Sequence, residues 1–184
     1  MPELSAAEYD NHHWLKKHVY LNLVRARHQR RFQAIAELCA GERFVDVGCA
    51  AGHSTFHLNE RKPGEWTGVN FAAAAIEQAR LAFPQFAFYH CVDFTEMVTL
   101  DAAPWDTAVC SEVIEHVEDD RGLLNALVHT AKRVVLTTPC VEVNDPGHLR
   151  LYDMGMLVEL CAGYDYTIMR GKPFWYVVVE KRAE

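Results

Sequence analysis

The sequence contains no CxxC pair, although it has six cysteines. These are spread along the chain at Cys39, Cys49, Cys91, Cys110, Cys140 and Cys161. Several of them lie in apolar stretches typical of strands, such as FYHC and TAVC. Scattered cysteines in such stretches indicate buried, reduced thiols, which is the usual state of cysteine in a cytosolic protein.

Long apolar runs are also missing. No stretch approaches the roughly 20 residues that a membrane-spanning helix needs. The first residues, MPELSAAEYDNHH, lack the basic segment followed by an apolar one that marks a secretory signal. Half of the residues are hydrophobic and 23% are charged, a balance typical of a soluble globular domain. We therefore expect a cytoplasmic protein with no membrane partner.

The chain has no overall excess of positive charge, since its formal net charge is −7. Surfaces that bind nucleic acid broadly are basic, so this balance argues against a nucleic-acid partner. The local exception is a group of six basic residues within sixteen positions, which we expect to form a solvated helix face. Its members are Lys16, Lys17, Arg25, Arg27, Arg30 and Arg31.

A chain of 184 residues is long enough for one domain with a substantial core and too short for two ordinary ones. Residues 9–39 contain no proline and carry apolar residues at helical spacing, so we expect residues 1–40 to form an N-terminal helical cap. Residues 41–184 then form the core of the same single domain, 1–184. Within the cap, Tyr9, His12, His13 and Trp14 are candidates to cover a ligand.

Strand-like and helical stretches alternate along the core. The strand-like runs are RFVDV, WTGVN, FAFYHC, DTAVC and RVVLTT, and helical patterns separate most of them. The helix before the fifth run has Asp119 or Asp120 available as its cap. This alternation predicts a parallel sheet with helices on both faces. Near the end of the chain, a helix around residues 153–161 precedes the runs YDYTIM and FWYVVVEK, which are close enough in sequence to pair only antiparallel.

The stretch FVDVGCAAGH, residues 44–53, has the form of a strand that runs into a glycine turn. Its spacing is neither GxGxxG nor GxxxxGK[ST], and Asp46 would repel a pyrophosphate at short range. The same carboxylate would attract a cation. A phosphate-free nucleoside with a cationic amino-acid end therefore fits the turn, and S-adenosylmethionine, with its ammonium and sulfonium, is such a ligand.

The segment VDVGCAAG resembles the first motif of the class I S-adenosylmethionine-dependent methyltransferases, with Ala50 in place of the middle glycine. Further segments resemble later motifs of that family in the same order: WTGVNFAAAAIEQAR, FYHCVDFTEM, WDTAVCSEVIEHVED, RVVLTTP and HLRLYD. The resemblance covers about residues 40–181. It implies a doubly wound, mostly parallel seven-stranded sheet with an antiparallel last strand. It also implies S-adenosylmethionine as the cofactor and residues 41–184 as the core that binds it.

The resemblance also implies which residues contact the cofactor. They are Asp46, Gly48, Cys49, Ala50, Gly52, Asn70, Phe71, Asp93, Phe94, Ser111 and Glu112. Asn70 departs from the family, which normally has an acid there that binds both ribose hydroxyls. An amide can accept one hydrogen bond and donate another, but it lacks the strength that charge adds. The family's usual serine helix cap is also replaced, by Ala72.

The stretch SEVIEH supports two readings. Glu112, Glu115 and His116 lie at i, i+3 and i+4, so one helical turn can present all three to a divalent cation. The spacing resembles the E-x-x-E-H motif of the methyltransferases that modify the terminal ribose of small RNAs, and His148 is a further possible ligand. In many relatives without a metal, however, the same motif only orders the loop and shapes the pocket floor. His116 and His148 are also the candidate catalytic bases, because histidine accepts a proton near neutral pH.

These motifs predict methyl transfer to a small molecule, at a hydroxyl group. Two alternatives stay open: metal-assisted 2′-O-methylation of an RNA terminal ribose, and a non-catalytic binding module that retains the fold. The changes at Asn70 and Ala72 are the sequence support for the second. A dinucleotide-dependent dehydrogenase is disfavoured, because both its glycine spacing and its usual second-strand acid are missing.

Overall fold

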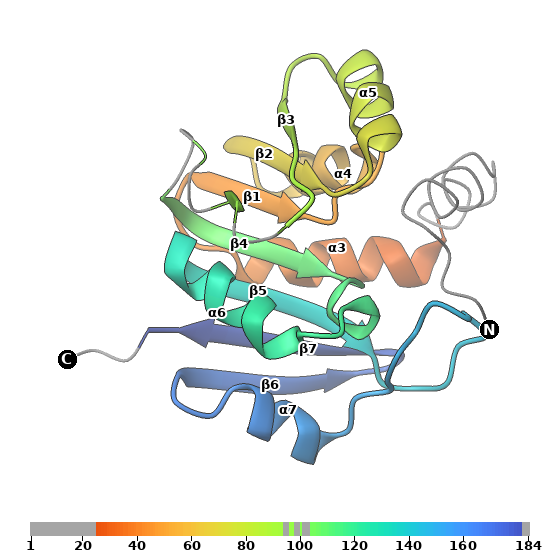
Figure 1. The fold of residues 1–184 in the computed structure, drawn as a ribbon, viewed down its shortest axis with the longest axis vertical. Helices are drawn as coiled ribbons and strands as arrows, with labels where there is room; N and C mark the ends of the chain where they lie inside the picture. The colour runs from red at the N-terminus through yellow and green to blue at the C-terminus, as the bar shows by residue number, and fades with distance from the viewer. Residues whose placement is uncertain (1–24, 94–95, 98–99, 101–103, 182–184) are drawn as a thin grey trace.

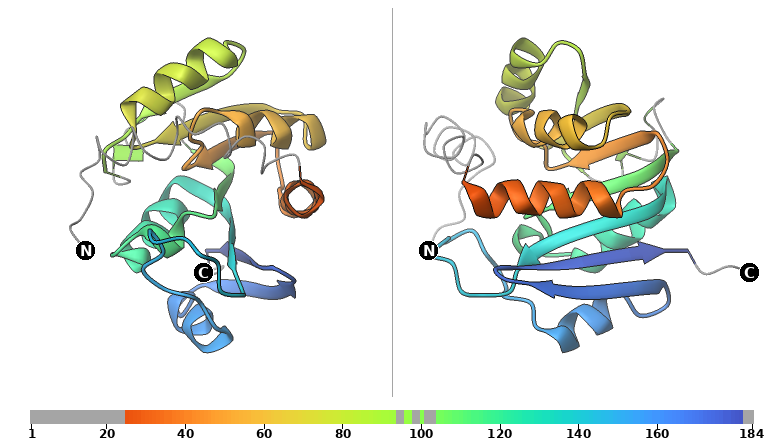
Figure 2. Two further views of the ribbon diagram at one scale, coloured as in Figure 1. Left: turned by 90° about the vertical axis from the view of Figure 1, so that its right-hand side faces the viewer. Right: turned by 180° about the vertical axis from the view of Figure 1, so that it is seen from behind.

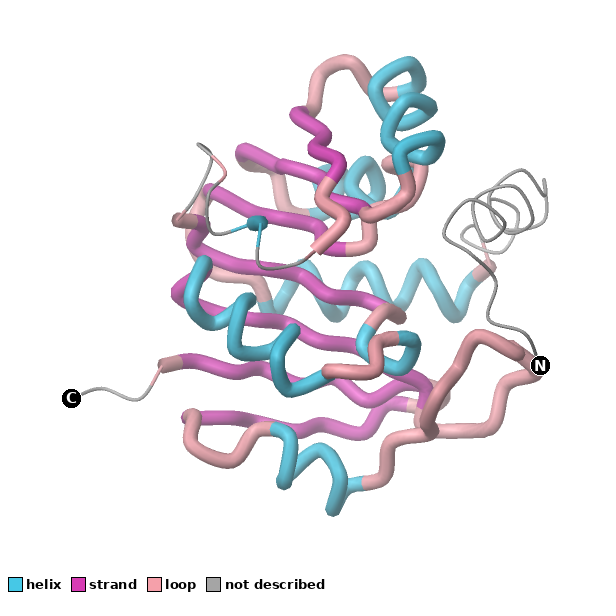
Figure 3. The backbone as a smooth tube through the Cα atoms, viewed as in Figure 1, coloured by secondary structure: helices cyan, strands magenta, loops and turns pink. Residues whose placement is uncertain are grey.

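The structure is a computed structural model that describes residues 25–93, 96–97, 100 and 104–181. Within these residues, seven strands form one sheet in the order β3-β2-β1-β4-β5-β7-β6 (Figures 1 and 3). The strands are β1 (Arg43–Val47), β2 (Glu65–Asn70), β3 (Ala87–His90), β4 (Trp105–Ser111), β5 (Ala131–Pro139), β6 (Asp165–Gly171) and β7 (Phe174–Glu180).

The first five strands are mutually parallel, and β7 runs antiparallel to both β5 and β6. This arrangement confirms the predicted doubly wound, mostly parallel sheet with an antiparallel last strand. β1, β4 and β5 are buried over most of their length, which explains why they read as nearly continuous apolar runs in the sequence. The strand order changes direction between β1 and β4, and ligands of such sheets bind at the carboxyl ends of the strands beside this point.

Helices cover both faces of the sheet (Figures 1 and 2). They are α3 (Ala26–Leu38), α4 (His53–Arg61), α5 (Ala73–Ala82), α6 (Asp120–Thr130) and α7 (Met154–Leu160), with a 3₁₀ turn, η3 (Ile114–His116), after β4. On one face α3 and α4 pack together, with the rings of Phe32 and His57 stacked at 5.5 Å. On the other face lie α6 and α7, over the larger apolar core, which includes Trp105, Leu124 and Leu136.

Acidic residues lie at the N-termini of α6 and α7, the two helices on that second face. Asp119 accepts a hydrogen bond from the Gly122 amide at 2.8 Å and so caps α6, whereas Asp120 accepts from the hydroxyl of Tyr152. Asp153 caps α7 in the same way, through the Met156 amide. The family's missing serine cap has a visible consequence, because Ala72 precedes α5 without any side-chain cap.

The N-terminal cap predicted over residues 1–40 is described only from Arg25 onward, where α3 provides its helix. The candidates Tyr9, His12, His13 and Trp14 lie outside the described residues. Among the helices that the structure describes, none is both long and apolar enough to cross a bilayer.

Candidate active site

Asp46, the acid of the glycine turn, is almost completely buried near the end of β1. One of its oxygens, Oδ2, accepts hydrogen bonds from the hydroxyls of Ser54 at 2.6 Å and Thr55 at 2.7 Å. Both hydroxyls belong to the first turn of α4, so the carboxylate joins the strand to the helix across the turn. Burial raises the pKa of Asp46, and the two hydroxyls oppose that rise.

The backbone of this turn has the left-handed conformation at three positions, with φ values of 78° at Gly48, 52° at Ala50 and 83° at Gly52. Ala50 thus keeps the conformation of the glycine that it replaces. Gly48 also allows a close approach, because a Cβ there would lie 2.3 Å from Val113 in the loop after β4. The turn after β1 and the loop after β4 are therefore packed against each other.

The strained Ala50 backbone gives a first prediction. A left-handed residue with a Cβ costs roughly 1–2 kcal/mol, whereas glycine costs about 0.5–1 kcal/mol in unfolded-chain entropy. Ala50→Gly should therefore raise the free energy of unfolding by up to about 1 kcal/mol in urea denaturation. Its neighbour Ala51, which has no positive φ, is the control, and Ala51→Gly should lower that free energy. A loss of stability in Ala50→Gly would contradict the interpretation.

Asn70, at the end of β2, is buried, and within the described residues its Nδ2 has no hydrogen-bond partner. A buried donor of this kind is normally paired, so it is available to a ligand hydroxyl. Phe71 follows and is 39% exposed, on the same edge of the sheet. Asp93 lies in the exposed turn after β3, and Phe94 is outside the described residues.

Ser111 is the last residue of β4, at the neighbouring position of this edge, and Glu112 follows it. The hydroxyl of Ser111 lies 2.8 Å from that of Thr137 on β5. Glu112 has a left-handed backbone, with φ of 59°, and its carboxylate forms an ion pair with Arg31 at 3.1 Å. Burial raises the pKa of Glu112, whereas the charge of Arg31 lowers it.

The expectation that the group of basic residues ending at Arg31 forms a solvated helix face is wrong for Arg31 itself. Arg25, Arg27 and Arg30 are exposed, but Arg31 is only 4% exposed. Its guanidinium lies 4.8 Å from the centre of the Phe174 ring, and its Nε has no hydrogen-bond partner within the described residues. The sequence carried a signal for this, because Arg31 precedes Ile35 by four positions and so shares the buried stripe of α3.

His28, one turn before Arg31 on α3, gives a prediction about pH. Burial, and then the positive charges of Arg31, Arg27 and Arg25, lower its pKa to about 4. Because the unfolded chain binds the proton near pH 6.5, the neutral ring's contribution to stability is complete above that pH and is lost as the pH falls toward 4.

Between pH 7.5 and 5.0, wild type should therefore lose about 1–2 kcal/mol more of its unfolding free energy than His28→Gln, which cannot titrate. Urea denaturation at the two pH values measures this difference. Equal losses in the two proteins would show that His28 does not resist protonation.

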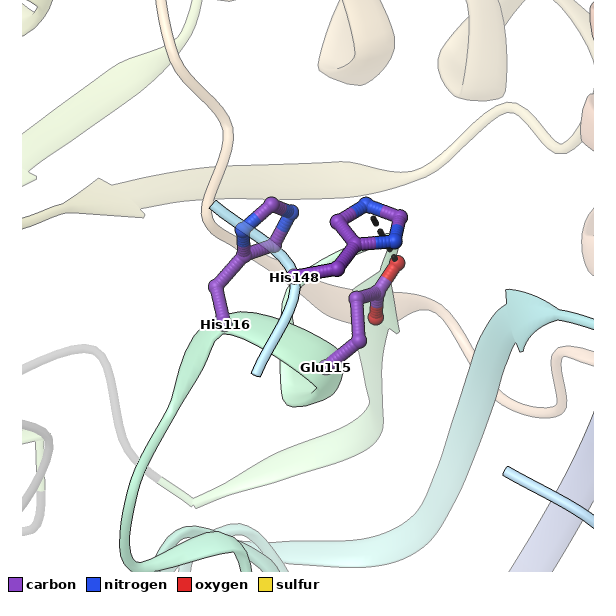
Figure 4. Close-up of side chains that lie close together, drawn as sticks. All are labelled: Glu115, His116 and His148. Atoms are coloured by element: carbon purple, nitrogen blue, oxygen red, sulfur yellow. Dashed lines mark ion pairs between the residues drawn. The ribbon is translucent and has the colours of Figure 1, made fainter. Parts of the chain in front are cut away.

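Glu115, His116 and His148 form a cluster in which one ligand atom from each lies within 4.8 Å of the others (Figure 4). Glu115 is fully buried, and neither of its oxygens has a hydrogen-bond partner within the described residues. Burial, and then the charge of Glu112, raise its pKa to about 8. His148 Nε2 lies 4.0 Å from Glu115 Oε1, and the two imidazole rings meet edge to face at 4.6 Å.

The contacts of His116 define its tautomer. Its Nδ1 lies 2.9 Å from the carbonyl oxygen of Gly147, which can only accept, so Nδ1 donates. In the neutral ring, Nε2 then carries the lone pair that a proton or a metal ion needs. Carboxylate and imidazole groups are suitable ligands for a divalent cation, and the unpaired oxygens of Glu115 fit one. Of the three residues predicted to bind a metal, the structure places Glu115 and His116 in this cluster, whereas Glu112 pairs with Arg31.

Comparison with known proteins shows which families and structures this chain is similar to. A profile described as "Methyltransferase domain" matches residues 45–133. The "Ubiquinone biosynthesis O-methyltransferase" of Neisseria meningitidis serogroup A is 30% identical over 101 residues, which cover 53% of this chain and 42% of that protein. The chain thus matches about two fifths of the length of this curated relative.

Solved structures show the same fold. The methyltransferase domain of bacterial CtHen1-CN has a TM-score of 0.66 at 19% identity, over 85% of this chain and all of that one. Magnesium protoporphyrin IX methyltransferase from Synechocystis PCC 6803, solved with bound S-adenosylmethionine, has a TM-score of 0.65 at 14% identity, over 88% and 83% of the two chains. The sheet order, the glycine turn and the profile matched over residues 45–133 agree, and together they support the assignment of this chain to the class I S-adenosylmethionine-dependent methyltransferases.

Proposed function

We propose that this protein transfers a methyl group from S-adenosylmethionine to a hydroxyl group of a small molecule. The observation that carries the proposal concerns buried side-chain nitrogen and oxygen atoms without hydrogen-bond partners. Within the described residues, all of them belong to five residues at the carboxyl ends of the parallel strands: His28, Arg31, Asn70, Glu115 and Thr138. Each such atom costs about 1–3 kcal/mol when it stays unpaired, so their grouping at one edge supports a polar ligand there.

The polar groups match the parts of S-adenosylmethionine. The guanidinium of Arg31 suits the methionine carboxylate, and the negative charge of Asp46 attracts the ammonium through the glycine turn. Asn70 suits a ribose hydroxyl, and Phe71 and Asp93 are the proposed contacts of the adenine. Gly48, Cys49, Ala50 and Gly52 form the turn beneath, and Ser111 and Glu112 form the adjoining wall.

When bound, the cofactor supplies a methyl group on a sulfonium, which is a strong electrophile. The residues of the chain would orient the acceptor hydroxyl toward that methyl group and exclude water. On transfer, the acceptor hydroxyl would give up its proton to a base of this chain. His148 and His116 are the candidates, since both imidazoles belong to the cluster around the buried Glu115.

Labelled methyl transfer to a panel of hydroxylated small molecules tests this function, together with calorimetric titration of S-adenosylmethionine and S-adenosylhomocysteine. We expect micromolar binding of both compounds and transfer to at least one acceptor. Binding without transfer to any acceptor would contradict the enzymatic proposal. Failure to bind either compound would favour the non-catalytic module.

A second candidate function, metal-assisted methylation, is favoured by the cluster of Glu115, His116 and His148. A divalent cation held there would replace the missing partners of Glu115 and would polarise the acceptor hydroxyl. The RNA terminal ribose is one acceptor that this chemistry suits. The candidate predicts that a chelator abolishes transfer and that added Mg²⁺ or Mn²⁺ restores it, whereas transfer that a chelator does not change would exclude it.

A further inference from the structure

We propose that the outer side of residues 140–158, here called the outer surface, binds the apolar body of the methyl acceptor. This inference rests on the proposed function and adds the class of substrate: a hydroxylated compound with an extended apolar part. The outer surface comprises the segment that follows β5 and the exposed side of α7 (Figure 1).

Exposed apolar side chains gather on this segment. Of the eleven large hydrophobic residues that are exposed among those described, seven lie between residues 141 and 158. Soluble proteins rarely expose apolar side chains in one contiguous group without a binding role. The group is continuous with the candidate catalytic residues, because His148 belongs to the same segment.

Buried and exposed side chains alternate along residues 148–152. His148, Arg150 and Tyr152 are partly or fully buried, and they contact the loop after β4 or the start of α6. Leu149 and Leu151, which stand between them, are 53% and 42% exposed.

Two open cavities lie along residues 140–158 and share Leu151. The first, of about 650 Å³, is lined by residues 142–145 and 148–151, which combine polar groups, among them Asp145 and His148, with apolar ones such as Leu149. The second, of about 460 Å³, is lined by residues that include Met154 and Trp175. Each volume is within the range of small-molecule sites, roughly 300–1,000 Å³. A hydroxyl at His148 would therefore leave room for an apolar body that extends across Leu151 toward Trp175.

The charges around the cavities argue against RNA as the occupant. Glu142, Asp145 and Asp153 line them, and the two arginines that do so are both engaged. Arg150 pairs with Asp120, and Arg170 lies 5.2 Å over the ring of Trp175. An RNA end would bring phosphates to this acidic rim, and RNA-binding surfaces provide unpaired cations instead.

Calorimetric titration with para-alkylphenols of increasing tail length tests the proposal, with and without saturating S-adenosylhomocysteine. We expect each added methylene to tighten binding to the wild-type protein by about fourfold. Leu151→Ser should remove most of this dependence on tail length and leave the affinity for S-adenosylhomocysteine unchanged. Leu81→Ser is the matched control, because Leu81 is 84% exposed on α5 and lines neither cavity.

Binding that does not depend on tail length would overturn the proposal, as would an equal dependence in the wild type and Leu151→Ser. Tight binding of a short single-stranded RNA together with no binding of the phenols would also overturn it. If the phenols bind with the expected dependence on tail length but receive no methyl group, the proposed binding role of the outer surface is supported and the proposed enzymatic function is contradicted. The two failures are therefore distinguishable.

Discussion

Arg31→Met should weaken the binding of S-adenosylhomocysteine by about 10- to 150-fold. A hydrogen-bonded ion pair with a buried guanidinium contributes roughly 1.5–3 kcal/mol, and methionine keeps most of the apolar length of the side chain while it removes the charge. Arg31 is 4% exposed and its Nε has no hydrogen-bond partner among the described residues, so a ligand carboxylate would be its second anionic partner beside Glu112. Calorimetry measures the change directly.

The prediction needs a control for stability, because Arg31→Met also leaves Glu112 buried without its partner. The double variant Arg31→Met, Glu112→Gln removes that unpaired charge. If Arg31 only supports Glu112, the double variant should recover cofactor affinity. If Arg31 contacts the cofactor, the affinity should stay low while the urea midpoint recovers. The neighbouring Arg30, which is exposed, provides the unaffected comparison as Arg30→Met.

Arg31 also shows which contacts of the site cannot be predicted from the sequence. The strand pattern and the turn at residues 44–53 are local, so alternation and spacing were sufficient to predict the parallel sheet and its ligand edge. The burial of a cation on α3 depends on a contact across 81 positions of sequence, with Glu112 after β4. Helical spacing relative to Ile35 can place Arg31 on the buried stripe of α3, but it cannot identify the distant acid that pairs with it.

The metal-type cluster was predicted in part for a similar reason. Helical spacing put Glu112, Glu115 and His116 on one turn, but the backbone is left-handed at Glu112, with φ of 59°, and only Ile114–His116 form a 3₁₀ turn. The carboxylate of Glu112 pairs with Arg31 instead. The third residue of the cluster is His148, which lies more than thirty positions later in the sequence.

Contacts made by Leu149, Arg150 and Tyr152, here together called the clamp, hold His148 in place. Arg150 and the hydroxyl of Tyr152 both bind the Oδ2 of Asp120, the hydroxyl at 2.7 Å. Arg150 also donates to the carbonyl oxygen of Glu118 at 3.0 Å. The Leu149 amide donates to the carbonyl oxygen of Glu115 at 2.9 Å, so the backbone directly after His148 is tied to the loop after β4.

Arg150→Met should therefore lower kcat by about 10- to 100-fold while the KM for S-adenosylmethionine changes little. The reason is that general-base catalysis contributes roughly 10²–10⁴ in rate and needs the base within hydrogen-bond reach, which small displacements destroy. Asp120→Asn should give a similar loss, and the double variant should be no worse than either single one, because the two residues act through one contact. Tyr152→Phe, which removes one of the two bonds to Asp120, should show an intermediate loss. A fall in kcat that adds fully in the double variant, or a KM that rises as much as kcat falls, would mean that the clamp acts on the cofactor site rather than on His148.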